Sequence, residues 1–404
     1  MLVRPLRPDM QITDVDIMYL TMPAIQAIAD GTQDTFLVRL GTDTGLEGWG
    51  ESDASPLVSI ACYCCPPSHS NIVNIRDSLL GATLESIDDL HRIRATVLRR
   101  ALDIQHVHHA FSAADIALWD LLGRRLEVPV YQLLDGPGAR PSPKLAYGSS
   151  LFADTPELTR ERARERRAAG FTAVKFGWGP LGSAGRELDV ALVAAAREGL
   201  GPDAELFVDA GWAWGEDAAT ALARAADFAQ HGVGWLEEPL LPEAIDAYAR
   251  LAAGGPGVPI AAGESSGKVR DAQDFIANGG IGIVQIDAGR VGGITAAHAV
   301  RRFADERGVT YVNHTFKSHL SLAAALHVFI ASERHRLAEY MVGGSPLATT
   351  LTTAPLDRAG DGTVTVPDAP GLGVTVDLDT VRRYVQPVTI TVGGRELLAG
   401  PPPL

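Results

Sequence analysis

Three carboxylates recur at nearly equal intervals along the chain. Asp209, Glu237 and Glu264 each lie just beyond a short apolar run. Strand–helix units of a parallel barrel repeat about every 25–30 residues, and residues just past each strand face the same C-terminal mouth. We therefore expect these side chains to converge on a cation. Three oxygen ligands with room for water and substrate suit Mg²⁺ rather than Zn²⁺, which prefers His and Cys.

The elements that would position these carboxylates alternate from about Lys144 onward. Helical segments separate short apolar strands, and residues 155–170 illustrate one helix, with an N-cap Thr155, a proline at the first helical position and a glycine after the end. Eight apolar strands are predicted to begin near Leu145, Ala173, Leu206, Trp235, Ile260, Ile283, Thr310 and Leu337. Eight such strands predict a closed α/β barrel.

The two ends of the chain differ from this alternating middle. Residues 112–122 are apolar on almost every face, which predicts a buried helix. Turn-rich sequence after about Leu351 resembles the beginning of the chain. We therefore expect the two ends to form one domain together. The strand-like segments at the ends are 15–20, 35–40, 46–51, 374–378 and 388–392.

Composition narrows the class of protein. The 404 residues exceed what one core usually supports, so we expect two domains. The net charge of −14, without a basic run, disfavours nucleic-acid and membrane partners and favours a small molecule. The N-terminal sequence has no apolar signal region, which predicts a cytoplasmic location. Cys62, Cys64 and Cys65 lie too close together for a disulfide framework and lack a fourth ligand for zinc, so structural thiols are expected.

Short motifs fall at the predicted strand ends in a fixed order. They are 48–51 (GWGE), 114–120 (ADIALWD), 208–210, 235–239, 263–265, 285–293, 313–314 and Glu339. Together they resemble the mandelate racemase subgroup of the enolase superfamily over essentially the full chain. The resemblance implies a modified TIM barrel, (β/α)₇β, at 141–352. It also implies an α+β capping domain formed by residues 1–140 and the returning segment 353–404.

The resemblance also implies a chemistry. The three carboxylates would bind Mg²⁺, and a substrate carboxylate on this ion would lose its α proton to give an enediolate. His314 is the expected base, with Asp287 fixing its tautomer. Lys175 is expected to hold the substrate carboxylate. Glu339, when protonated, would donate a hydrogen bond to the enediolate; the alternative for Glu339 is a surface salt bridge with Arg336.

The second barrel strand departs from the subgroup. Where the usual motif is Lys-x-Lys, this chain has Gly177 in place of the second lysine, the base on the opposite substrate face. Two-base racemization needs groups on both faces, whereas His314 alone can run a syn β-elimination. We therefore predict a Mg²⁺-dependent dehydratase that converts an aldonate or aldarate to a 2-keto-3-deoxy acid. The alternatives are a racemase, epimerase or cycloisomerase with Lys175, Tyr147 or a cap residue as second acid/base, and a non-catalytic binding protein.

The residues that contact the rest of the substrate are harder to predict. The expected specificity loop, residues 21–31, is mostly apolar, whereas a polyhydroxylated acid needs polar contacts. Either the substrate is less polar, or contacts come from the barrel, where the candidates are Tyr147, Lys175, Trp178, Trp212, Trp214, Lys268 and Lys317. Glu238 is predicted to be structural, and His319 and His327 to pack or lie at the surface. A homo-oligomer is expected.

Overall fold

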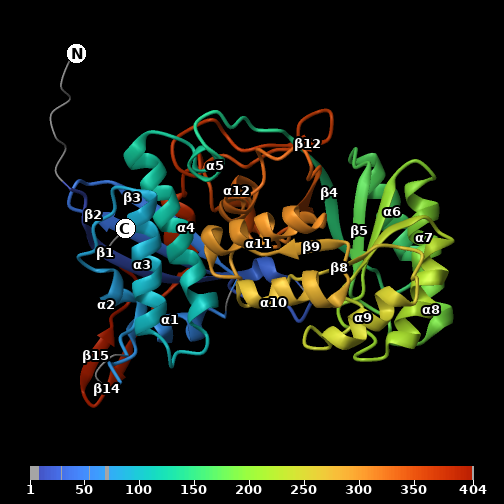
Figure 1. The fold of residues 1–404 in the computed structure, drawn as a ribbon, viewed down its shortest axis with the longest axis horizontal. Helices are drawn as coiled ribbons and strands as arrows, with labels where there is room; N and C mark the ends of the chain where they lie inside the picture. The colour runs from blue at the N-terminus through green and yellow to red at the C-terminus, as the bar shows by residue number, and fades with distance from the viewer. Residues whose placement is uncertain (1–8, 29, 54, 69–71, 403–404) are drawn as a thin grey trace.

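The computed structural model describes residues 9–402, except for 29, 54 and 69–71. Its antiparallel sheet and first helices lie at one end of the molecule, and the parallel barrel lies at the other (Figure 1). The helices and 3-10 turn that precede the barrel are η1 (Gly31–Gln33), α1 (Pro56–Cys64), α2 (Ile75–Leu79), α3 (Ile87–Arg100), α4 (Val107–Leu126) and α5 (Val130–Asp135). No helix among the described residues is long and apolar enough to span a bilayer.

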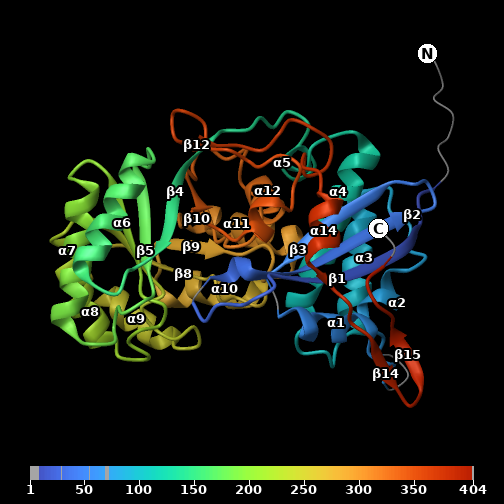
Figure 2. The same cartoon turned by 180° about the vertical axis from the view of Figure 1, so that it is seen from behind.

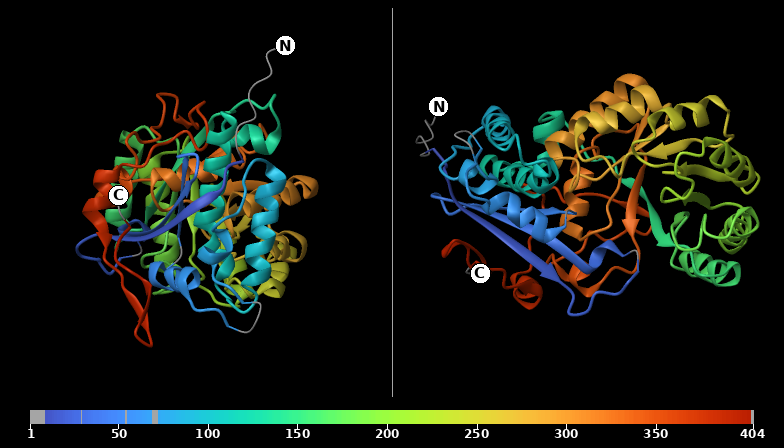
Figure 3. Two further views of the ribbon diagram at one scale, coloured as in Figure 1. Left: turned by 90° about the vertical axis from the view of Figure 1, so that its left-hand side faces the viewer. Right: turned by 90° about the horizontal axis from the view of Figure 1, so that it is seen from below.

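The antiparallel sheet joins both ends of the chain. Its strands are β1 (Ile12–Thr21), β2 (Asp34–Thr42), β3 (Glu47–Ser52) and the C-terminal β13 (Val385–Gln386). The strand order is β13-β1-β2-β3, and β13 pairs with β1 through Tyr19 and Leu20. Both views of Figure 3 show the C-terminal segment beside the cap sheet. The three N-terminal strands predicted from the sequence are therefore confirmed.

All eight predicted barrel strands are present. They are β4 (Lys144–Leu151), β5 (Ala173–Gly177), β6 (Glu205–Asp209), β7 (Val233–Glu237), β8 (Ile260–Ala262), β9 (Ile283–Ile286), β10 (Thr310–Asn313) and β11 (Leu337–Met341). The ladder runs in the order β10-β9-β8-β7-β6-β5-β4-β11, and Figure 2 shows helices around its outside. These are α6 (Pro156–Ala168), α7 (Arg186–Leu200), α8 (Ala218–Ala229), α9 (Ile245–Ala253), α10 (Val269–Asp274), the π-helical η2 (Phe275–Gly279), α11 (Gly293–Arg307) and α12 (His319–His327).

Side chains, not a backbone ladder, close the barrel. Within the described part of the chain, no strand ladder joins β10 to β11. The fully buried amide of Asn313 takes its place: Nδ2 donates to the Glu339 carbonyl at 3.2 Å, and Oδ1 accepts the Glu339 N–H at 3.0 Å. The expected closed barrel is thus nearly closed by strands, and side-chain hydrogen bonds complete it: those of Asn313, of Glu339 with the Thr315 N–H at 2.7 Å and of His335 with the Tyr311 N–H at 3.1 Å. We call this junction the Asn313 seam.

The C-terminal segment differs in part from expectation. Residues 374–378 do not form a strand, because only an isolated bridge joins Thr352 to Val376 and α14 (Leu378–Tyr384) follows at once. The Asp377 side chain caps this helix by accepting the Thr380 N–H at 2.6 Å. The remaining elements are α13 (Pro346–Thr350), β12 (Thr363–Val364), which pairs with β4, and the hairpin of β14 (Ile390–Val392) and β15 (Arg395–Leu398). The predicted strand at 388–392 therefore exists in part.

The buried helix predicted at 112–122 lies within α4 and connects the two parts of the molecule. Its Asp115 accepts the Thr295 N–H at 2.9 Å in the first turn of α11. Its Asp120 accepts the N–H groups of Trp49, in β3, and Leu372, in the C-terminal segment, at 3.1 and 2.9 Å. Two buried carboxylates therefore attach this helix to the barrel, the cap sheet and the C-terminal segment.

Two further predictions concern side chains away from the barrel mouth. His319 and His327 are buried, and their Nδ1 atoms accept the backbone N–H groups of Leu356 and Tyr131, each at 3.1 Å, so their packing role is confirmed. The three cysteines are free, and burial raises the pKa of Cys62 to about 11, which suits unreactive structural thiols. The domain boundaries, the homo-oligomer and the cytoplasmic location stay predictions.

Replacing Asn313 with Ala should open the seam. The substitution leaves the buried N–H and carbonyl of Glu339 without partners, so we expect the free energy of unfolding to fall by about 2–4 kcal/mol. Urea denaturation followed by circular dichroism measures the loss. Asn278→Ala is the matched control, because Asn278 is exposed. Equal stability of the two variants would show that the seam does not hold the barrel together.

Candidate active site

The three carboxylates converge at the barrel mouth. Asp209 and Glu237 end β6 and β7, Glu264 lies just past β8, and one oxygen of each lies within 4.8 Å of the others. All three are buried. Burial and the nearby Glu237 raise the pKa of Asp209 well above its ordinary value, and burial raises the pKa of Glu237 to about 7 against the opposing effect of Lys175. Such crowding of buried anions calls for a cation, and oxygen-only ligands fit a hard divalent ion.

Protein donors fix the orientation of these carboxylates. The indole N–H of Trp178 donates to Asp209 Oδ2 at 3.0 Å, and the Gly211 N–H donates to Oδ1 at 2.9 Å. The indole N–H of Trp235 donates to Glu237 Oε2 at 3.1 Å. Because these donors come from rigid strand ends and their loops, the oxygens are preorganised for a common ligand.

Lys175 lies between two carboxylates of the site. Its Nζ is 2.6 Å from Glu237 Oε1 and 2.8 Å from Glu339 Oε1. Burial alone would lower the pKa of Lys175, but these carboxylates raise it well above its ordinary value. Burial alone would raise the pKa of Glu339, but neighbouring cations, Lys175 first, lower it. Arg336 instead pairs with Glu205 at 2.8 Å, which rules out the surface salt bridge considered for Glu339.

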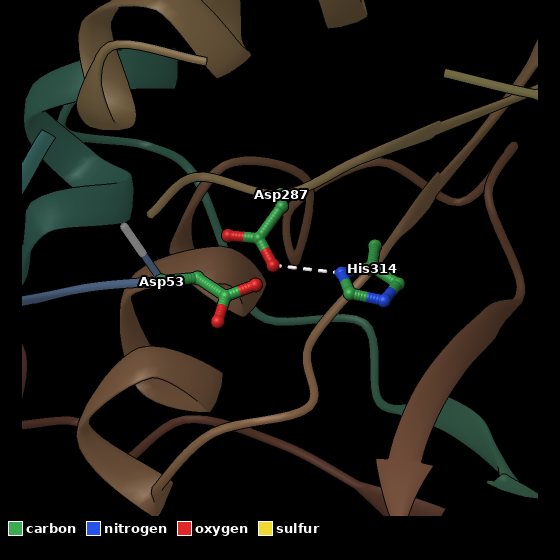
Figure 4. A group of neighbouring side chains, drawn as sticks. All are labelled: Asp53, Asp287 and His314. Carbon is green, nitrogen blue, oxygen red and sulfur yellow. Dashed lines mark hydrogen bonds and ion pairs between the residues drawn. The ribbon is translucent and has the colours of Figure 1, made fainter. Parts of the chain in front are cut away.

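His314 and Asp287 form a hydrogen-bonded pair just past β10 and β9 (Figure 4). Nδ1 of His314 lies 2.7 Å from Asp287 Oδ2, and Nε2 lies 3.3 Å from Glu264 Oε2. Since a carboxylate accepts, Nδ1 donates and Nε2 is left to exchange a proton. Burial alone would lower the pKa of His314, but Glu264, Glu339 and Asp287 raise it to about 10.

Two charged residues of this site were not predicted. Asp53 follows β3 of the cap and Arg290 lies just past β9, and the two are joined by a hydrogen bond of 2.5 Å from Arg290 Nε. Lys317 Nζ contacts the other Asp53 oxygen at 3.1 Å. Figure 4 shows Asp53 beside Asp287 and His314. Arg290 and Lys317 already balance the charge of Asp53, so this group does not need a metal ion. Asp53 and Arg290 both follow a strand end, and the rule that predicted Asp209 from its position at a strand end could also have identified them.

A cavity of about 130 Å³ lies among these side chains. Its walls come from the cap and the barrel together. The residues that line it are Gly31, Asp53, Ser149, Ser150, Leu151, Lys175, Gly177, Trp178, Asp209, Glu264, Arg290, His314, Phe316 and Glu339. The structure therefore brings a cluster of possible metal ligands, a His–Asp pair and a buried lysine to one small chamber.

Two predicted substrate contacts lie outside this chamber. Tyr147 is fully buried in the barrel interior, edge-on to two aromatic rings, and does not line the cavity, so its contact with substrate stays a prediction. Trp212 packs against Trp178 and donates its indole N–H to Glu238. Glu238 also accepts the Ser265 hydroxyl at 2.8 Å, which agrees with its predicted structural role. Of the predicted aromatic contacts, only Trp178 lines the cavity.

The three remaining candidates for substrate contact also lie outside the cavity. Besides Asp53, Lys317 contacts the Asp34 carbonyl at 2.8 Å, so it connects the barrel to the cap. Lys268 is exposed and lies 3.9 Å from Asp271. Trp214 packs against Phe228. None of the three lines the cavity among the described residues. The polar side chains that line the cavity are therefore the remaining candidates for polar substrate contacts.

Gly177 occupies the position that holds the second lysine of the usual Lys-x-Lys motif, and its surroundings leave no space for a side chain. It pairs in register with Asp209 of β6, and a Cβ added to Gly177 would lie 2.6 Å from the Asp209 Cβ. No side chain fits there unless Asp209 moves. Trp178 follows with φ 54°, in the left-handed region that non-glycine residues rarely adopt. The missing base thus reflects close packing around a carboxylate of the cluster.

Known proteins match the chain over nearly all of its length. The description "Mandelate racemase / muconate lactonizing enzyme, N-terminal domain" matches residues 12–135, and "Enolase C-terminal domain-like" matches 158–380. D-galactarolactone cycloisomerase of Agrobacterium fabrum is 30% identical, covering 87% of this chain and 91% of its own. D-galactonate dehydratase of Xanthomonas oryzae is 29% identical, covering 86% and 90%. A crystal structure described as a predicted mandelate racemase from Rhodobacter sphaeroides is 44% identical, covering 97% and 100%, with a TM-score of 0.92.

Substitution of Gly177 with Ala should weaken cation binding. The added methyl group displaces Asp209, so we expect divalent-ion affinity to fall on the order of tenfold or more. Isothermal titration of the purified variant with a divalent chloride measures the change. Gly138→Ala is the control, because no atom lies within 4 Å of the Cβ added there. Unchanged affinity in both variants would mean that Asp209 is not a ligand or tolerates displacement.

Proposed function

The chain belongs to the mandelate racemase and muconate lactonizing enzyme family of the enolase superfamily, and on that premise we propose a Mg²⁺-dependent β-elimination from an acid sugar. The observation that carries the proposal is asymmetry of the cavity. The His314–Asp287 pair is the acid/base pair of the cavity. On β5, Gly177 offers no acid or base and cannot be replaced without moving Asp209, and Lys175 is already paired with Glu237 and Glu339. One-sided acid/base chemistry favours elimination over two-base inversion.

The cluster of Asp209, Glu237 and Glu264 would hold the metal ion. Mg²⁺ bound there would stabilise the negative charge that develops on the substrate carboxylate as the α proton leaves. Lys175, already within ion-pairing distance of Glu237 and Glu339, would bind a carboxylate oxygen of the substrate. The substrate carboxylate would then replace Glu339 as a partner of Lys175. Glu339 would be free to take up a proton and to donate a hydrogen bond to the enediolate oxygen.

His314 would perform both proton transfers. Glu264 is the carboxylate that most raises the pKa of His314, so a cation bound to Glu264 would offset this effect and favour the neutral imidazole. With Nδ1–H held by Asp287, neutral Nε2 would then accept the α proton, and the Asp287 carboxylate would stabilise the resulting imidazolium. The same Nε2 then delivers that proton to the departing oxygen on the same face. His314 thus removes a proton and delivers the same proton to the leaving group, so the reaction needs no second base.

Dehydration is the leading form of this reaction. The departing group is the β-hydroxyl, and the resulting enol rearranges to a 2-keto-3-deoxy acid. The match to D-galactonate dehydratase supports this choice. In this proposal the substrate is an aldonate or related acid sugar.

A cycloisomerase is the second candidate, with a ring oxygen as the departing group. The relative named D-galactarolactone cycloisomerase supports it. So does the 21–31 loop of the cap, where Ile25 and Ile28 are 57% and 54% exposed, since a cyclic substrate offers fewer hydroxyls to bind. The same residues would perform both reactions. A racemase or epimerase is disfavoured by Gly177, and a non-catalytic binder by the complete ligand cluster and His–Asp pair.

Magnesium should stabilise the folded protein. At a concentration about 100 times its dissociation constant, Mg²⁺ should add about 2.7 kcal/mol to the free energy of unfolding. Glu237→Gln should abolish this gain, as measured by melting temperature with and without MgCl₂. Glu205→Gln, at an acid on the barrel exterior paired with Arg336, is the control. A gain that persists in Glu237→Gln would contradict the ligand assignment.

His314→Asn should stop turnover. Purified enzyme with Mg²⁺ is incubated in D₂O with a library of aldonates, aldarates and sugar lactones, and products are identified by proton NMR and semicarbazide. We expect a 2-keto-3-deoxy acid, with kcat reduced about 10²–10⁴-fold in the variant. His91→Asn, at an exposed position, is the control. Ring opening without loss of water would instead establish the cycloisomerase, and α-deuterium with inversion but no keto acid would establish an epimerase.

A further inference from the structure

We propose that Asp53 makes the site selective for a substrate with one carboxylate and an uncharged, hydroxyl-bearing remainder. The inference rests on the proposed function, which places one substrate carboxylate at the metal cluster and Lys175. It adds which acid sugars qualify: aldonates, anhydro-aldonates and monolactones of diacids, each with one free carboxylate, but not open-chain diacids.

The first step of the argument is the charge of the cavity wall. Carboxylates outnumber permanent cations among the described residues that line it. The carboxylates are Asp53, Asp209, Glu264 and Glu339, and the permanent cations are Lys175 and Arg290. A bound divalent ion, the reacting carboxylate and the three carboxylates of the metal cluster together keep a negative charge, and Lys175 and Glu339 offset each other. The selectivity for the remainder of the substrate therefore depends on Asp53 and Arg290.

The second step is that the charge of Arg290 is already compensated. Its Nε binds Asp53 at 2.5 Å, and its Nη1 contacts the Glu264 carbonyl at 3.3 Å. Lys317, on the other side of Asp53, is held by that carboxylate and by Asp34 at 3.1 and 3.3 Å. A second substrate carboxylate would thus meet no uncompensated cation on this side of the cavity, within the described part of the chain.

The third step is the state and place of Asp53 itself. Although burial favours the neutral form, Arg290 and Lys317 outweigh it and hold the pKa of Asp53 well below its ordinary value. One of its oxygens lies within 4.8 Å of the ligand atoms of Asp287 and His314. An ionised carboxylate can only accept hydrogen bonds, so it attracts a substrate hydroxyl, and in a cavity of about 130 Å³ it repels a second substrate carboxylate, including one at the distal carbon.

The test compares two acids that differ only at the distal carbon. D-galactonate carries a hydroxymethyl group there, and galactarate carries a carboxylate. Their dissociation constants are measured by isothermal titration with the Mg²⁺-loaded protein at fixed ionic strength, and turnover of each acid is measured in parallel. The variant is Asp53→Asn, which keeps the shape but removes the charge and frees Arg290 and Lys317.

Asp34→Asn is the matched control. Asp34 also pairs with Lys317 but does not line the cavity. This variant therefore weakens the cap contact of Lys317 without changing the wall. Melting temperatures of both variants show whether each remains folded. If Asp53 mattered only for attaching the cap, the two variants would behave alike toward both acids.

We expect the wild type and Asp34→Asn to bind the monoacid at least about tenfold more tightly than the diacid, and Asp53→Asn to reduce this ratio on the order of tenfold. An unchanged ratio in Asp53→Asn, or wild-type preference for the diacid, would overturn the inference while leaving β-elimination intact. Selective binding without turnover would overturn the proposed function alone. Failure of the wild type to bind either acid would overturn both.

Discussion

The compensation of buried charge at the barrel mouth is the constraint on which the rest of this structure depends. Isolated buried carboxylates cost several kcal/mol each unless they are paired. Lys175 offsets Glu237 and Glu339 from within the barrel, while Arg290 runs from Glu264 to a cap residue. Even with these partners, Asp209, Glu237 and Glu264 place three carboxylates within 4.8 Å of one another, and Lys175 and Arg290 also serve Glu339 and Asp53. A divalent ion would complete this balance, so metal binding and stability depend on the same contacts.

The need for these counter-charges explains why the cap and barrel are connected so firmly. Asp53 reaches the cavity only because β3 is held against α4, whose Asp115 and Asp120 bond to the barrel and to the C-terminal segment. Lys317 adds a contact from the barrel to the cap backbone. A barrel alone would leave Arg290 without its nearest carboxylate partner. The two ends of the chain therefore contribute to the electrostatics of the site as well as covering it.

Local rules were enough to predict the barrel strands and the carboxylate cluster, because position past a strand end determines which residues meet at the mouth, whereas the His–Asp pair was expected from the family resemblance. Local rules could not predict how deep a side chain lies along its strand, or which residues far apart in the sequence form ion pairs. Tyr147 and Ser149 point to the same side of β4, but two residues correspond to about 6.6 Å along a strand, so one lies in the interior and the other lines the cavity. Asp53 and Arg290 meet across 237 residues of sequence. The strand expected at 374–378 is instead an irregular segment with one isolated bridge, and the helix that Asp377 caps begins at its end.

The Asn313 seam gives this barrel a degree of freedom that a continuous ladder would not allow. Backbone ladders fix the strand separation whatever the sequence, whereas here side chains, with the Asn313 amide at the centre, join β10, which leads into His314, to β11, which carries Glu339. A change at one codon could therefore alter the spacing of these two groups while the remaining strand pairs keep their register. In evolution or protein engineering, substitution of position 313 is therefore a direct way to change how His314 and Glu339 are placed around a substrate.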